Sequence, residues 1–121
     1  MKENVLKDKS LCFAIRIVKL YQYLCEEKKE FVLSKQLLRS GTSVGAMVRE
    51  SEHAESKSDF RHKLSIAQKE INETLYWLEL LKATQYLEED FYTSINSDAI
   101  EIIKLVTSIL KSTKASLTIN N

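Results

Sequence analysis

The sequence predicts an all-α protein built as a bundle of four helices. The 121-residue chain has no proline and only two glycines, whereas a β-rich domain needs turn residues at each hairpin. Apolar residues recur at helical spacing in four segments that short polar stretches separate. A chain of this length forms one domain around one core. We expect an antiparallel up-down-up-down bundle with helices at about residues 10–28, 33–52, 58–84 and 89–115.

The first predicted helix is apolar around most of its circumference. Ser10 is its expected N-cap, and residues 1–9 are expected to be frayed or a short lead-in. Two interpretations stay open: the helix is central to the bundle, or part of its surface faces another subunit. Cys12 and Cys25 lie about 20 Å apart along this helix, which is too far for a disulfide. Two isolated, buried thiols suit a reducing cytosol, so we expect a cytoplasmic protein.

The charge balance gives no strong indication of a partner. The chain has 18 Lys and Arg residues and 17 Asp and Glu residues, for a net charge of +1. No global field therefore draws it to nucleic acid, although a local basic face remains open. It contains no run of 18 apolar residues, so we expect no membrane-spanning helix. Arg16 and Lys19 interrupt the N-terminal apolar run, whereas a signal peptide has an uninterrupted apolar segment, so we expect no signal peptide here.

The second predicted helix carries both glycines on its apolar face. It follows residues 26–30, a charge run that we expect to be a solvated connection. Gly41 and Gly45 are four residues apart, and each costs about 1 kcal/mol relative to alanine inside a helix. The usual compensation is close approach of a second backbone. A phosphate-binding loop is the alternative for residues 40–45, but the preceding strand and the Gly-Lys-Ser/Thr motif are missing.

The third and fourth predicted helices have regular apolar stripes. Ser58 and Asp59 provide a good start for the third helix. Its expected core stripe is Phe60, Leu64, Ala67, Ile71, Leu75 and Leu78. The fourth helix repeats Phe91, Ile95, Ala99, Ile102, Val106, Ile109 and Leu110. The tail after Lys114 is expected to be loose.

Pairing across the second and third helices predicts a polar network. In an antiparallel hairpin about residue 54, opposed residue numbers sum to about 108–110, which places Arg39 beside Glu70 and Glu73. We expect a partly buried ion pair there. Paired carboxylates can also act as general acid and base, but here an arginine neutralises them. Ser40 and Ser43 have no histidine or lysine at a spacing that indicates an activated nucleophile.

A metal site is the second chemical alternative. Di-iron bundles use Glu-x-x-His twice, with further inward glutamates, and this chain contains Glu50-x-x-His53 and Asp59-x-x-His62. Both pairs lie at the turn between helices, and the first and fourth helices supply no inward glutamate. We therefore predict no metal and no cofactor, with both histidines exposed.

Basic and aromatic residues on the same hairpin are candidates for binding nucleic acid. The candidate basic set is Lys35, Arg39, Arg49, Lys57, Arg61, Lys63 and Lys69. Acidic residues are interleaved with it, and such a mixture is typical of a solvated face. Tyr76, Trp77 and Tyr86 are able to stack on bases, but such aromatics more often close a bundle end or an interface.

The hairpin also carries a pattern that resembles a known family. Its two runs are Gln36-Leu-x-Arg39-Ser40-x-Thr42-Ser43-Val44-Gly45-Ala46 and Lys69-Glu70-x-x-Glu73-Thr74-x-Tyr76-Trp77-Leu78. These runs resemble the four-helix bundle proteins encoded in 23S rRNA intervening sequences, over about residues 4–115. The matching motif residues are Arg39, Ser43, Glu50, Asp59, Lys69, Glu70, Glu73 and Trp77. Met47 stands where the family pattern usually has asparagine.

The resemblance implies a homo-oligomeric ring, typically a homopentamer, without enzymatic activity. Members of the family look like accessory proteins of diversity-generating retroelements, which are basic pentameric barrels that bind nucleic acid and a reverse transcriptase. We therefore expect a non-enzymatic, RNA-associated or ribosome-associated oligomer that binds mainly phosphates. The first alternative is a protein scaffold with no role in nucleic-acid binding. The second is a metal-dependent enzyme with its site in the bundle core.

Overall fold

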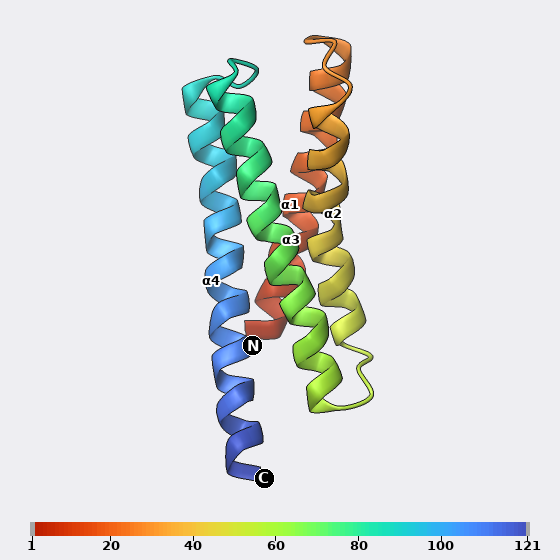
Figure 1. The fold of residues 1–121 in the computed structure, drawn as a ribbon, viewed down its shortest axis with the longest axis vertical. Coiled ribbons are helices and arrows are strands. Elements are labelled where there is room, and N and C mark those ends of the chain that lie inside the picture. Colours follow the sequence, from red (N-terminus) through yellow and green to blue (C-terminus); the bar gives the residue numbers. More distant parts are fainter. Residues whose placement is uncertain (1, 121) are drawn as a thin grey trace.

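The computed structural model describes residues 2–120, with side chains described for residues 2–114. It contains four helices: α1 (Lys2–Glu26), α2 (Leu33–Ser51), α3 (Lys57–Ala83) and α4 (Glu89–Asn120). No strand occurs in residues 2–120, so the prediction of an all-α chain with four helices is confirmed. Consecutive helices run in opposite directions along the long axis of the molecule (Figure 1).

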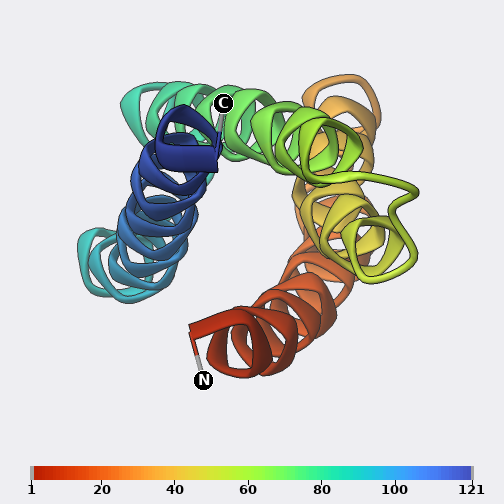
Figure 2. The same cartoon turned by 90° about the horizontal axis from the view of Figure 1, so that it is seen from below.

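The helices surround the core in chain order. Each helix packs against the next one along the chain, and α4 also meets α1, which is the least extensive of the four contacts (Figure 2). The predicted stripes of α3 and α4 supply much of the core, including Leu64, Ile71 and Ile102, which are fully buried. Phe91 is the exception, because it is 38% exposed at the start of α4.

The first helix begins earlier than the sequence predicts. α1 starts at Lys2, because Leu6 is buried in the core and anchors the first turns of the helix. Ser10 is no N-cap: it is buried, and its hydroxyl donates to the Lys7 carbonyl oxygen at 3.1 Å within the helix. The prediction of a frayed or short lead-in over residues 1–9 is therefore wrong for residues 2–9.

The connection between α1 and α2 is not the solvated charge run that the sequence predicts. Glu30 is buried, and its carboxylate accepts the backbone N–H groups of Val32, Leu33 and Ser34 at 3.3, 3.1 and 2.8 Å. These donors are among the groups that a helix start leaves without a partner. Burial opposes ionisation of Glu30, but the three backbone N–H donors hold its pKa below the ordinary value. Glu30 thus caps α2.

The other helix ends differ from prediction by smaller steps. Ser56 is the N-cap of α3, and its hydroxyl accepts from the Asp59 N–H at 3.0 Å. Asp59 in turn accepts from the Glu55 N–H at 3.2 Å, so the two side chains stabilise the turn reciprocally. α4 stays helical to Asn120, which corrects the predicted loose tail after Lys114.

The two glycines lie where α1 and α2 approach each other. A Cβ atom on Gly41 would lie 2.8 Å from Ile17 Cγ1, and one on Gly45 would lie 3.4 Å from the Ser10 carbonyl oxygen. Both glycines face α1 of the same chain: a second backbone lies beside Gly45, as predicted, whereas the neighbour of Gly41 is the Ile17 side chain. The glycine face therefore provides no argument for a second subunit.

The two cysteines are free, as the sequence predicts, but they are not both buried. Cys12 is exposed, because it lies on the side of α1 that faces outward beside α4, and Cys25 is half-buried. The Cys25 thiol lies 3.8 Å from the Ser34 hydroxyl. Among the described residues, no helix has a stretch that is both long enough and apolar enough to cross a membrane.

Candidate functional site

The predicted polar network joins α2 to α3 at the molecular surface. Arg39 Nη2 lies 3.1 and 3.0 Å from the two carboxylate oxygens of Glu73, and Arg39 Nη1 lies 3.8 Å from Glu70 Oε2. The predicted pairing of Arg39 with both glutamates is therefore present in the structure. Its predicted burial is wrong for the arginine, because the Arg39 side chain is 58% exposed. Ion pairs that are exposed to this degree contribute about 0.2–1 kcal/mol to the free energy of unfolding.

Two polar atoms on the same side of α3 have no hydrogen-bond partner. Glu70 Oε2 and Trp77 Nε1 are both buried and lack a hydrogen bond within the described residues. Among the described residues, Glu70 Oε2 has only the 3.8 Å ion pair with Arg39 to offset its loss of contact with water, and Trp77 Nε1 has no hydrogen bond at all. Met47, at the position where the family pattern has asparagine, packs against the core and adds no polar partner of comparable strength.

The serine hydroxyls of the network are engaged with backbone or core groups. Ser43 donates to the Arg39 carbonyl oxygen at 2.6 Å, and Ser40 lies in the core with its hydroxyl 2.9 Å from that of Thr74. Within the described residues, neither serine hydroxyl has a hydrogen bond to a histidine or a lysine. These hydroxyls stabilise the α2–α3 seam and have no general base beside them.

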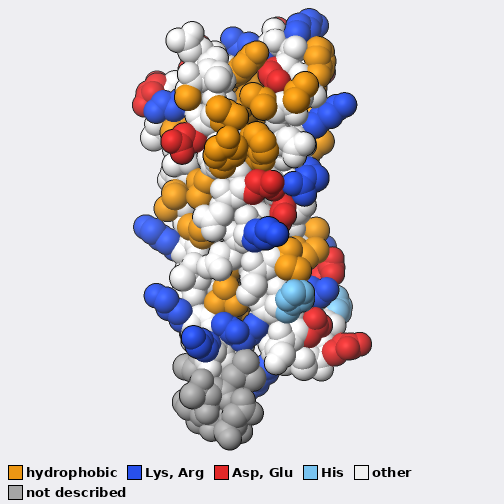
Figure 3. Space-filling model, in the orientation of Figure 1, with side chains coloured by type: hydrophobic (Ala, Val, Ile, Leu, Met, Phe, Trp, Pro, Cys, Tyr) orange, Lys and Arg blue, Asp and Glu red, His pale blue; other side chains and the backbone are white. Residues whose placement is uncertain are grey.

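The predicted basic set is divided among several faces of the hairpin. Arg39 pairs with the two glutamates of α3, and Lys63 pairs with Glu50 at 3.2 Å. Arg61 points to the other side of α3, where its Nη2 donates to the Leu110 carbonyl oxygen of α4 at 3.4 Å. Figure 3 shows basic and acidic side chains interspersed over the middle of the visible face. The structure therefore does not gather this set into one basic surface.

The remaining members of the set are exposed. They are Lys35 and Arg49 on α2, and Lys57 and Lys69 on α3. Their exposure is compatible with phosphate contacts, but they are spread along the hairpin over both helices. Exposed lysines and arginines spaced in this way are typical of an ordinary solvated surface.

The two pairs that the sequence offers as an alternative metal site, Glu50 with His53 and Asp59 with His62, are not assembled into one. His53 is exposed in the α2–α3 turn and His62 is exposed in the first turns of α3. Glu50 pairs with Lys63, and Asp59 caps α3. Across residues 2–114, no group of three His, Cys, Asp or Glu side chains is arranged to hold a metal ion.

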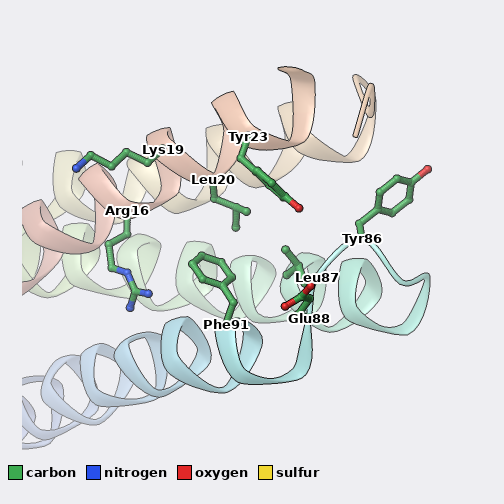
Figure 4. Close-up of a pocket in the computed structure, with 8 residues that line it drawn as sticks. All are labelled: Arg16, Lys19, Leu20, Tyr23, Tyr86, Leu87, Glu88 and Phe91. Carbon is green, nitrogen blue, oxygen red and sulfur yellow. The ribbon is translucent and has the colours of Figure 1, made fainter. Parts of the chain in front are cut away.

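A cleft that the sequence did not indicate lies between α1 and the start of α4. Its volume is about 450 Å³, and its lining residues are Arg16, Lys19, Leu20, Tyr23, Tyr86, Leu87, Glu88 and Phe91. In Figure 4, Leu20 and Tyr23 point from α1 toward Phe91 and Leu87, while Arg16 stands at one end. The walls are thus mainly apolar, with charge at the ends. The exposure of Phe91 and Tyr23 reflects this opening.

The outer face of α1 is a second apolar surface. Leu11, Ile15 and Val18 are 48%, 47% and 38% exposed, and they follow each other at steps of four and three residues. Such residues form one stripe along a helix, here on the side away from the core. α1 therefore combines a core face with an exposed apolar face. That this exposed face meets another subunit stays a prediction.

Comparisons with known proteins give a consistent result. The chain matches the family model of the 23S rRNA-intervening sequence proteins over residues 2–108. It is also similar to a crystal structure from Bacteroides thetaiotaomicron, described as a protein of unknown function from the S23 ribosomal protein family. The two chains are 62% identical, the match covers 92% of this chain and 99% of the other, and the TM-score is 0.91. None of the curated proteins matches the chain.

Proposed function

Because the chain belongs to the 23S rRNA-intervening sequence protein family, we propose that it is a non-enzymatic, cytoplasmic homo-oligomer that associates with RNA or ribosomes. The single observation that supports an oligomer best is the exposed apolar stripe on α1. The association with RNA is supported by the names of the family and of the similar structure, which refer to 23S rRNA and to a ribosomal protein family.

The α1 stripe is suited to a contact between copies of the chain. Burying the exposed part of each of its three side chains contributes on the order of 1 kcal/mol per residue. A helix that is apolar on both faces is typical of a helix between two packed layers. We propose that the stripe packs against a neighbouring copy and that repetition of this contact closes a ring of five subunits, the number that the family resemblance implies.

The absence of catalysis is proposed from the chemistry of the hairpin. The motif serines donate to backbone or lie in the core, and Arg39 neutralises the paired glutamates. Two further motif residues also have structural partners, because Glu50 pairs with Lys63 and Asp59 caps α3. Binding to RNA would then be electrostatic, with contacts to phosphates and strong dependence on salt.

Native mass spectrometry of the purified protein tests the oligomer. We expect a ring of five for the wild type and a shift to monomers for Ile15→Glu, because the substitution places a charge in the apolar stripe. Ser97→Glu adds the same charge at an exposed position of α4 and should leave the native mass unchanged apart from the side chain. A monomeric wild type, or an unchanged Ile15→Glu assembly, would refute the α1 interface.

Binding of the oligomer to a structured 23S rRNA fragment and to duplex DNA tests the second part of the proposal. We expect an affinity that falls steeply with salt, with similar values for unrelated sequences. Absence of binding at low salt would refute the association with nucleic acid.

A protein scaffold is the second candidate function, and the α1–α4 cleft favours it. Its exposed aromatic residues, Tyr23 and Phe91, are of the kind that anchor protein partners. If the oligomer forms but binds neither RNA nor DNA, this function becomes the better account of the chain.

A further inference from the structure

The second half of α4 carries a basic face of its own. Residues 102–121 contain three lysines and no acidic residue. Lys104 and Lys111, together with Ile103, Thr107 and Ser108, line a shallow depression on this half of the helix. In Figure 3, Lys and Arg side chains gather over the lower left of the molecule, where α4 descends in Figure 1, with no Asp or Glu visible among them.

A third ammonium group joins this face from α1. Lys2 Nζ donates to the hydroxyl of Ser108, which places the first residue of α1 beside the depression. The acid next to it along α4 is Glu101, whose carboxylate pairs with Lys9 of α1. Because Glu101 already has a cationic partner, it offsets the positive charge of Lys2, Lys104 and Lys111 only weakly. The local balance differs from that of the α2–α3 hairpin, where Arg39 and Lys63 are themselves neutralised.

The hydroxyl groups of Thr107 and Ser108, which line the depression, are free to donate a hydrogen bond to a ligand. The Thr107 hydroxyl accepts from Gln68 Nε2 at 3.1 Å, and the Ser108 hydroxyl accepts from Lys2. In the described part of the chain neither hydroxyl donates to a helix carbonyl, whereas Thr113, further along the helix, donates to the Ile109 carbonyl oxygen at 2.8 Å. Thr107 and Ser108 can therefore donate to an acceptor outside the protein, such as a phosphate oxygen.

We propose that this face of α4, with Lys2, is the site that binds the phosphate backbone of a nucleic acid. Lys104 and Lys111 are about 10 Å apart along the helix, the distance covered by about three phosphates of one duplex strand. Ammonium groups and hydroxyl donors in one stripe recognise phosphates without reading bases. This inference rests on the proposed function and assigns it to α4, whereas the sequence pointed to the hairpin lysines and arginines.

A pair of double variants tests the assignment on the full-length oligomer. Lys104→Gln with Lys111→Gln removes two charges from α4, and Lys35→Gln with Lys69→Gln removes two exposed charges from the hairpin. Binding of each protein to a 23S rRNA fragment and to duplex DNA is measured across a salt series. Circular dichroism and native mass should be unchanged in both variants, because all four side chains are exposed.

We expect the α4 variant to lose affinity for all sequences alike, and the slope of log K against log salt to decrease by about two. The hairpin variant should bind like the wild type. An unchanged α4 variant, or equal losses in both variants, would overturn the assignment to α4 while leaving nucleic-acid binding in place. A wild-type protein that binds neither nucleic acid at low salt would overturn both proposals.

Discussion

Helix α1 has two lateral neighbours, and it meets them in different ways. Against α2 it packs through small residues: Gly41 faces Ile17, and Gly45 faces the backbone at Ser10. Gly41, Ile17 and Ser10 are buried, and Gly45 is half-buried. Against α4 it packs only in part through core residues, and long charged side chains bridge the rest of the seam. Clefts lie on this second seam, including the apolar cleft of about 450 Å³ in Figure 4.

The difference shows how side-chain size separates closely packed from open surfaces within one bundle. Small residues let two backbones approach closely, so that the seam becomes a dry, tightly packed part of the core. Long charged side chains keep the helices apart and contribute little free energy while they are exposed. The α1–α4 side therefore retains open surfaces, and the proposed phosphate site lies beside it. Substitutions on the two seams should differ in their effects accordingly.

The largest effect is expected for Gly41→Leu on the tight seam. A Cβ atom at this position already lies 2.8 Å from Ile17 Cγ1 and 2.9 Å from Cγ2, so a whole leucine forces α1 and α2 apart. Overpacking of this kind lowers the free energy of unfolding by about 3 kcal/mol. Urea denaturation monitored by circular dichroism measures the change.

Gly45→Ala is the control on the same seam, because its Cβ would meet Ser10 at ordinary contact distances, the nearest atom being the carbonyl oxygen at 3.4 Å. The gain in helix propensity is about 1 kcal/mol, so we expect unchanged or slightly higher stability. An unchanged urea midpoint for Gly41→Leu would show that the seam is not tightly packed at Gly41. A loss for Gly45→Ala as large as that for Gly41→Leu would show that the seam has no more room at Gly45 than at Gly41.

The second effect concerns Glu30, which caps α2 at the end of the tight seam. Glu30→Gln removes the charge that three backbone N–H groups share, and it should lower the free energy of unfolding at pH 7 by about 1–2 kcal/mol. Because the pKa of Glu30 in the folded chain lies below its ordinary value of 4.5, its contribution is complete above about pH 5. The contribution is lost as the pH falls through the folded pKa.

Urea titrations of wild type and Glu30→Gln between pH 7 and pH 3 test this behaviour. The gap in unfolding free energy between the two proteins should narrow as the pH falls, because the wild-type carboxylate becomes protonated. Glu27→Gln, an exposed neighbour in the same charge run, serves as the control and should stay close to wild type. A gap of constant size at all pH values would contradict a charged cap.

Local pattern was sufficient to predict the four helices and one cross-helix pair. Apolar spacing alone identified buried residues such as Ile71 and Ile102, because a helix repeats its inner face every three to four residues. Counting across a hairpin was enough to bring Arg39 to Glu73, because a short turn fixes the register of the helices that it joins. The close packing at the glycines was predicted from composition, because a glycine inside a helix is costly unless another backbone approaches it.

Features that depend on the path of a loop or on distant parts of the chain were missed. Glu30 reads as one member of a charge run, and only the folded loop turns its carboxylate toward the start of α2. Phe91 has the spacing of a core residue, yet it is exposed at the α1–α4 cleft. The proposed α4 site needs Lys2 from the other end of the sequence. Sequence spacing carries no information on such contacts.

The smallest effect is expected on the open seam, at the ion pair between Arg16 and Asp98. Arg16 Nη1 lies 2.6 Å from Asp98 Oδ2, and the guanidinium also lies 5.4 Å from the centre of the Phe91 ring. Both charged side chains are about one-third to one-half exposed, so water and salt screen their attraction. A double-mutant cycle of Arg16→Gln and Asp98→Asn should give a coupling of about 0.5 kcal/mol, decreasing further in about 1 M salt. A salt-independent coupling above about 2 kcal/mol would mean that this seam holds the bundle together as tightly as the glycine seam, and the contrast between the two sides of α1 would be lost.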